Sequence, residues 1–152
     1  MLDGHDGNVK MLIQGISRRY KGITFLTEPD NFDDICILSS ENVSELITAC
    51  AELADELIID LSCACDARTR KVFETADRVL LVTESTVSAG VKLTQFISQN
   101  NVFESIKEKV TLVANKGAVI NEPFVNSIIS LPFVKSDDAV NVCKVLSEQV
   151  WV

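Results

Sequence analysis

Apolar residues in this chain gather into runs of strand length, and three of these runs contain four apolar residues each. They cover residues 57–61, 78–83 and 109–115. Strands with consecutive apolar residues are usually buried on both faces, as in a parallel sheet that helices cover on each side. Two shorter runs of strand length occur at 22–26 and from Ile128 to Ser130–Pro132.

Between these runs, apolar residues recur every three or four positions, which is the spacing of amphipathic helices. Ser39 or Ser40, Asp66, and Ser85 or Thr86 precede such segments and are good N-cap residues. We expect helices over 8–20, from 40 to 53, from Asp66 to about Ala76, from Ser85 or Thr86 to Ile97, and from Asp137 or Asp138 to about Glu148. Alternating strands and helices predict a single doubly wound, mostly parallel three-layer α/β domain over residues 1–152.

Polar side chains follow three of the predicted strands at the points where the strands end. They are Asp60, Thr83 and Asn115. Ligands of open parallel sheets bind beyond the carboxyl ends of the strands, so we expect these side chains to converge on one ligand site. The pattern leaves two explanations open for Asp60, a Mg²⁺ ligand or a turn residue that ends a strand.

The composition narrows the class of partner. The chain has 152 residues, 47% of them hydrophobic, with 14 basic and 22 acidic residues and a net charge of -8. Because no excess of cations is available to neutralise phosphates, nucleic acid and anionic membranes are not expected partners.

The cysteine count and the apolar run lengths bear on localisation. Five cysteines and no recognisable leader favour the reducing cytoplasm. No apolar run approaches the ~20 residues of a membrane span. The predicted terminal helix has Lys144 as its only cation, so we expect no stable membrane anchor there.

Four short sequence motifs between residues 57 and 146 occur in a characteristic order. They are Ile58–Asp60, Ala76–Glu84, Val110–Lys116 and Ser130–Phe133. Together they resemble the MinD/ParA family of deviant-Walker P-loop ATPases. In that family, the aspartate of the first motif is the Walker B residue and the asparagine of the third contacts adenine. The resemblance implies a P-loop NTPase-like fold with ATP or ADP and Mg²⁺ as ligands.

The resemblance assigns roles residue by residue. Asp60 becomes the candidate metal ligand, and Asn115 the candidate adenine contact. Thr83 and Lys116, at the same strand ends, complete the candidate nucleotide-binding set. No catalytic residue is assigned.

This sequence departs from the family pattern in the residues that would bind the phosphates of the nucleotide. None of the six glycines lies in a G-x-x-x-x-G-K-[ST] loop, whose backbone N–H groups and lysine cradle phosphates. Ser62–Cys65 replaces the small or Pro-Gly residues that follow Walker B, and the role of Asp66 stays open. We therefore expect weak or absent binding of ATP, ADP and Mg²⁺, and weak or no independent hydrolysis of ATP.

The strand that carries the missing loop lies in the middle of the family's sheet. Its absence leaves unpaired backbone groups and an apolar edge. We expect a rearranged sheet, an oligomer, or a chain that is one piece of a longer protein.

The part before Asp60 is similar to the Tad-pilus localisation branch of the family, TadZ and CpaE. The likeness lies in Gly22–Leu26, Pro29, Asp33-Asp34 and the segment Glu41–Leu53. It implies a positioning or assembly module whose partners are further copies or other assembly proteins. Two alternatives stay open: the C-terminal part of an active ATPase with its P-loop in a missing N-terminal segment, and an unrelated doubly wound domain with another ligand.

Other chemistry-bearing residues have ordinary structural explanations. Cys63 and Cys65 lack the Cys-x-x-Cys spacing of redox and zinc sites and are expected to be buried structural thiols. His5 is the only histidine and no nucleophile motif accompanies it, which argues against a Ser-His-Asp or Cys-His hydrolase. The cations Arg68, Arg70 and Lys71 are expected on a solvated helix face.

Overall fold

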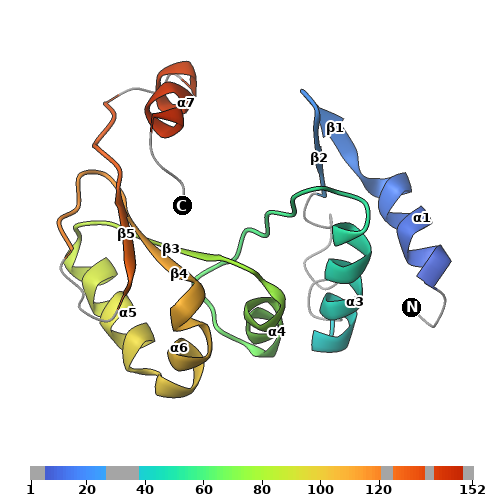
Figure 1. The fold of residues 1–152 in the computed structure, drawn as a ribbon, viewed down its shortest axis with the longest axis horizontal. Coiled ribbons are helices and arrows are strands. Elements are labelled where there is room, and N and C mark those ends of the chain that lie inside the picture. Colours follow the sequence, from blue (N-terminus) through green and yellow to red (C-terminus); the bar gives the residue numbers. More distant parts are fainter. Residues whose placement is uncertain (1–5, 27–37, 121–124, 136–138, 149–152) are drawn as a thin grey trace. The chain divides into compact units, whose positions relative to one another are not determined.

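The computed structural model describes residues 6–26, 38–120, 125–135 and 139–148. The chain divides into two compact units, Met1–Thr75 and Ala76–Val152 (Figure 1). His5, Pro29, Asp33-Asp34 and the predicted caps Asp137 and Asp138 lie outside the described residues. The single domain over 1–152 stays a prediction.

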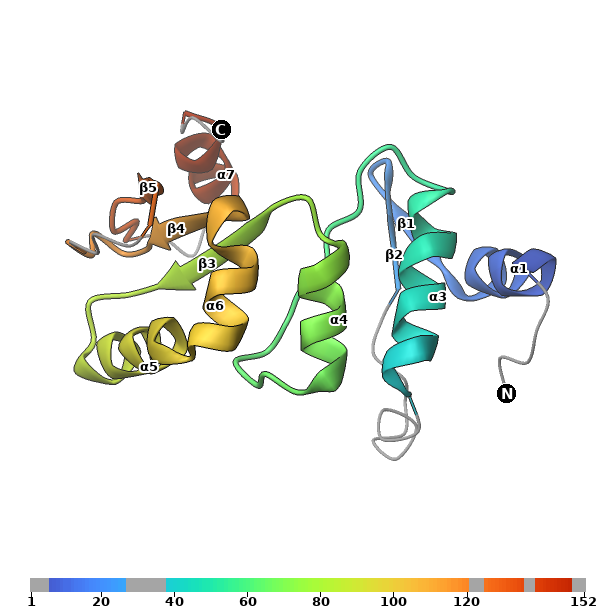
Figure 2. The ribbon, with the colours of Figure 1, turned by 60° about the horizontal axis from the view of Figure 1, so that its bottom comes forward.

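The first unit contains three helices and one β-hairpin in its described residues. Its elements are α1 (Asp6–Ile16), β1 (Arg18–Tyr20), β2 (Ile23–Phe25), α3 (Ser40–Ala51) and α4 (Ala67–Thr75). Helix α3 contacts both α1 and α4, so it is the central helix of the unit (Figure 2). Ser39 caps α3 and Asp66 caps α4, and both caps confirm the predictions.

The predicted helix over 8–20 is wrong beyond Ile16. Residues 18–20 instead form an antiparallel hairpin with residues 23–25. Lys21 and Gly22, which join the two strands, have positive φ angles of 49° and 87°. Two positive φ angles are typical of the type I′ turn that matches the twist of a hairpin. The glycine therefore favours a turn where the apolar spacing suggested one more helical turn.

The run at 57–61 was predicted as a buried strand, and this prediction is wrong. Residues 57–62 form no strand. Ile58 is 86% exposed, and Leu57 and Ile59 are each 38% exposed. A strand requires a neighbour for its backbone groups, and in the described part of this unit the only sheet is the β1–β2 hairpin. The apolar run alone does not supply that neighbour.

The second unit is built on a parallel sheet. Its elements are β3 (Val79–Thr83), α5 (Val87–Ser98), α6 (Asn100–Ile106), a short 3₁₀ helix η1 (Lys107–Lys109), β4 (Val110–Ala114), β5 (Ser127–Ser130) and α7 (Ala139–Ser147). The strand order is β3-β4-β5 and both pairings are parallel. The α/β class predicted from the sequence is confirmed.

Strand β4 is the buried centre of this sheet. All five of its residues are buried, and Leu112 and Ala114 have 0% exposure. The buried strand predicted at 109–115 is therefore confirmed.

Strand β3 starts one residue later than predicted and ends at Thr83 as predicted. The prediction that β3 is buried on both faces is wrong, because Leu80 is 51% exposed and Val82 is 61% exposed. Strand β3 lies at one end of the described sheet, where only β4 pairs with it.

Helices lie on both sides of the sheet, with α5 and α6 on one side and α7 on the other (Figures 1 and 2). Helix α7 packs Leu146 against Val113, Ile129 and Leu131. Helix α6 was not predicted, although its buried side chains have helical spacing: Val102, Phe103 and Ile106. Thr86 caps α5 through the N–H of Ala89, one of the two predicted caps. Among the described helices, none combines the length and apolar character needed to cross a membrane.

Candidate functional site

The carboxyl ends of β3 and β4 lie side by side. Thr83 is in register with Ala114, and the N–H of Asn115 donates to the carbonyl oxygen of Thr83 at 2.8 Å. The N–H of Leu131, which follows β5, donates to the carbonyl of Ala114 at 2.8 Å. The structure thus brings together two of the three predicted strand-end residues, Thr83 and Asn115.

A tight turn follows β4 and fixes Asn115. The N–H of Ala118 donates to the carbonyl of Asn115 at 3.1 Å, and the two residues between them have positive φ angles of 55° (Lys116) and 71° (Gly117). The side-chain oxygen of Asn115 accepts the N–H of Lys116 at 2.9 Å. Its side-chain nitrogen makes no hydrogen bond among the described residues and remains a donor for a ligand.

Lys116 is paired across the strand ends with Glu84. Its Nζ donates to Oε2 of Glu84 at 2.7 Å, with side-chain exposures of 57% and 35%. Glu84 was not predicted as a site residue. Its signal in the sequence is its position, because Glu84 and Lys116 each follow neighbouring parallel strands by one or two residues.

A pocket of about 210 Å³ lies beside this turn. Asn115 and Lys116 form the polar side of the pocket. The rest of the lining is apolar and comes from the segment after β5 and from α7: Leu131, Pro132, Phe133, Val134, Val142, Val145 and Leu146. Pockets for whole drug-sized ligands have volumes of roughly 300–1,000 Å³. At about 210 Å³ this pocket is smaller than that range, so it has room for only part of such a ligand.

The turn offers no cradle for phosphates. The backbone N–H groups of residues 116–118 all donate hydrogen bonds within the protein. The N–H of Lys116 donates to the side chain of Asn115, that of Gly117 to the carbonyl of Leu131 at 2.8 Å, and that of Ala118 to the carbonyl of Asn115. The only cation at the pocket, among the residues that line it, is Lys116, which Glu84 already neutralises. The residues present fit the base of a nucleotide and do not fit its phosphates.

Asp60, the candidate metal ligand, belongs to the first unit and is exposed. It follows no strand in this structure. No cluster of three or more His, Cys, Asp or Glu residues suited to a metal ion occurs among the residues described. A single carboxylate can hold Mg²⁺ together with water, so the metal role of Asp60 stays a prediction.

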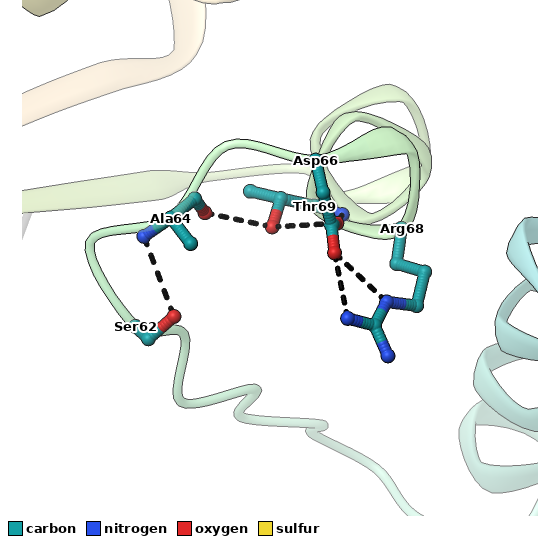
Figure 3. Close-up of polar contacts among 5 residues, drawn as sticks. All are labelled: Ser62, Ala64, Asp66, Arg68 and Thr69. Carbon is teal, nitrogen blue, oxygen red and sulfur yellow. Dashed lines mark hydrogen bonds and ion pairs between the residues drawn. The ribbon is translucent and has the colours of Figure 1, made fainter. Parts of the chain in front are cut away.

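Both carboxylate oxygens of Asp66 accept hydrogen bonds at the start of α4 (Figure 3). Its Oδ1 accepts the N–H of Thr69 at 3.0 Å, and its Oδ2 accepts Nε and Nη2 of Arg68 at 2.9 and 2.7 Å. The Thr69 hydroxyl donates to the carbonyl of Ala64 at 3.0 Å. The Thr69 N–H and the Arg68 guanidinium lower the pKa of Asp66 from 3.8 to about 2. Asp66 therefore has a structural role as a helix cap.

The neighbouring cations and thiols also have structural roles. Lys71 Nζ donates to Oε2 of Glu74 at 2.9 Å on the exposed face of α4, and this bond raises the pKa of Lys71. Cys63 is exposed and Cys65 half-buried, and both are free thiols. The solvated helix face agrees with the prediction. The prediction that the two thiols are buried is wrong for Cys63, which is exposed.

We expect Asp66→Asn to remove an acid-dependent part of the stability of the first unit. Since folding lowers the pKa of Asp66, its contribution is present above pH 3.8 and is lost as the pH falls through about 2. The melting temperature of Asp66→Asn, followed by circular dichroism, should lie below that of the unmodified chain at pH 6, and the difference should disappear by about pH 2. The control Asp55→Asn changes an exposed aspartate that has no hydrogen bond among the described residues. A difference of the same size at pH 2 and pH 6 would contradict the role of the charge.

Comparison with known proteins identifies a shared fold. Neither the protein-family models nor the curated proteins gave a match to the sequence. Among solved structures, the chain is similar to a ParA family ATPase from Chlorobium tepidum TLS, with a TM-score of 0.69 and 21% sequence identity. The match covers 95% of this chain and 65% of the other. The chain therefore shares the α/β fold of that ATPase and spans 65% of its length.

Proposed function

We propose that this chain is a ParA/MinD-like module that binds a nucleotide base weakly, does not hydrolyse ATP by itself, and acts in positioning or assembly. The observation that carries the proposal is the turn after β4, where the Asn115 amide faces a ring-sized pocket while every backbone N–H of the turn is engaged. The fold shared with a ParA family ATPase supports it.

The finer assignment rests on the sequence. The resemblance of Gly22–Leu26 and Glu41–Leu53 to the TadZ and CpaE branch supports a pilus-localisation type of role in the cytoplasm. Partners would then be further copies of this chain or other assembly proteins. The net charge of -8 supports a role that involves no nonspecific contact with nucleic acid.

The absence of hydrolysis can be tested with the purified chain. Incubation with Mg²⁺ and ATP should release no more inorganic phosphate than buffer does, and Asp60→Ala should leave that background unchanged. Hydrolysis by the purified chain that Asp60→Ala abolishes would overturn the proposal and would assign Asp60 a metal role.

We expect Asn115→Ala to weaken binding of adenosine about tenfold, because the variant loses a hydrogen bond in a partly buried pocket, a contribution of about 1–1.5 kcal/mol. Calorimetric titration with adenosine measures the change. Asn141→Ala is the matched control, since Asn141 is exposed on α7 and does not line the pocket. Equal affinities for adenosine in the two variants would show that the base binds elsewhere or not at all.

A second candidate is the C-terminal part of an active ATPase whose phosphate loop comes from a preceding segment. It is favoured by the 65% coverage of the ParA family ATPase, which leaves part of that protein without a counterpart here. Sequencing the DNA upstream of the codon for Met1 tests it. An in-frame strand followed by a Gly-rich, Lys-bearing loop would favour this candidate over an autonomous module.

A further inference from the structure

Strand β3 forms an edge of the parallel sheet. In the order β3-β4-β5, one side of β3 pairs with β4, and no other described strand pairs with its second side. An edge strand presents unpaired N–H and C=O groups that can pair with another chain.

One hydrogen bond shows which residues of β3 face that edge. The carbonyl of Thr83 accepts the N–H of Asn115, so the backbone groups of Thr83 point toward β4. Backbone groups point to opposite sides at successive residues of a strand. Those of Leu81 therefore also point toward β4, and those of Leu80 and Val82 point to the open edge.

The side chains of the same two residues are apolar and exposed. Leu80 is 51% exposed and Val82 is 61% exposed. On β4, their partners in register, Thr111 and Val113, are 6% and 2% exposed. The cover that protects this face of β4 does not extend over β3.

Opposite charges flank the strand at equal distances from its centre. Arg78 precedes Leu81 by three residues, and Glu84 follows it by three. An antiparallel copy of β3, related by a two-fold axis at Leu81, would place each Arg78 opposite a Glu84. Opposite charges in such cross-strand positions attract, and like charges repel.

We propose that β3 pairs with β3 of a second copy of this chain, antiparallel about a two-fold axis at Leu81. In this register Leu80 lies opposite Val82 of the partner, and these are the residues whose backbone groups face the open edge. The pairing joins two three-stranded sheets into one continuous sheet and brings the exposed Leu80 side chain beside Val82 of the partner on the same face. Registers centred on Leu80 or Val82 also satisfy the backbone, but they place no Arg78 opposite a Glu84.

The inference builds on the assembly role proposed above. Its test measures mass and not nucleotide binding, so the two proposals can fail separately. Sedimentation equilibrium of the full chain should give twice the monomer mass of 16.7 kDa.

A charge exchange tests the register. Arg78→Glu should raise the dissociation constant of the dimer about tenfold, because two symmetry-related pairs change from attraction to repulsion. Arg78→Glu combined with Glu84→Arg and Lys116→Glu should restore most of the affinity, because the third change keeps an opposite charge beside residue 84, where Glu84 now pairs with Lys116. Val82→Lys should abolish the dimer by placing a charge on the edge, and Val119→Lys, at a residue that is 96% exposed and outside the strand, should not.

Three results would overturn the inference. One is a monomer at about 100 μM protein, far above the micromolar affinities of specific complexes. Another is a dimer that Val82→Lys and Val119→Lys affect equally. The third is a combined charge exchange at residues 78, 84 and 116 that gives a dimer no tighter than that of Arg78→Glu alone, which would exclude the two-fold axis at Leu81. Circular dichroism of each variant identifies any that fails to fold, and the Val119→Lys dimer then serves as the reference for folded protein.

Discussion

Leu112→Ala should lower the free energy of unfolding of the second unit by about 2–5 kcal/mol, the usual cost of removing a fully buried leucine. Leu112 has 0% exposure and lies in the middle of β4, with a strand on each side and helices over both faces of the sheet. Its replacement leaves a cavity that neither sheet neighbour can fill. Urea unfolding followed by circular dichroism measures the change.

The matched control is Ile128→Ala. Ile128 is the partner of Leu112 in register on β5, but it is 40% exposed. We expect less than half the loss found for Leu112→Ala, since much of the Ile128 side chain already contacts water. Similar losses in the two variants would contradict β4 as the buried centre of this sheet.

Gly117→Ala should cost about 1–2 kcal/mol of stability, because φ at this position is 71° and an L-residue is strained there. The added Cβ would lie 3.8 Å from the backbone nitrogen of Phe133, an ordinary contact, so the cost comes from the backbone and not from a clash. Relief of the strain would shift the turn that fixes Asn115. We therefore expect adenosine binding to fall together with stability, as measured by calorimetry and urea unfolding.

Gly90→Ala is the control for this substitution. Gly90 lies inside α5, and a Cβ at this position meets nothing within 4 Å. Alanine is favoured over glycine inside a helix by about 0.5–1 kcal/mol, so this variant should gain stability. If both variants changed stability in the same direction, the positive φ would not be the cause of the Gly117 effect.

Most strands and helices of the second unit could be predicted from the sequence, because its apolar patterns and helix caps agree with how the unit packs. Val79–Thr83 and Val110–Ala114 are apolar at nearly every position and are strands where predicted, and Thr86 supplies the helix cap between them. Helix α6 was missed because it directly follows α5, with Gln99 as the C-cap of one helix and the N-cap of the next. No loop separates the two helices, so the sequence gives no sign that one helix ends and the next begins.

The first unit shows where sequence patterns fail. The run at 57–61 has the composition of a buried strand, yet strand formation depends on a neighbour, which composition does not encode. Arg18–Tyr20 continues an amphipathic helical spacing, yet the turn at Lys21 and Gly22 converts it to a hairpin strand. In both cases, contacts outside the segment decide its structure.

The candidate site was predicted in part. Strand-end positions identified Thr83, Asn115 and Lys116, because parallel strands bring their carboxyl ends to one edge. The sequence did not reveal that Glu84 forms an ion pair with Lys116. It also did not reveal that the N–H groups of the turn donate hydrogen bonds within the protein. These depend on the backbone conformation of Lys116 and Gly117, which no composition rule provides.

The most direct test of the account compares adenosine, ADP and ATP, each with and without Mg²⁺, by calorimetric titration of the purified chain. Because the pocket fits a base and the turn offers nothing to phosphates, we expect all three ligands to bind with weak affinities within about threefold of one another, or about 0.6 kcal/mol, and Mg²⁺ to have no effect. Mg²⁺-dependent binding of ATP more than about tenfold tighter than that of adenosine would contradict the account, since it would require a phosphate site in this chain.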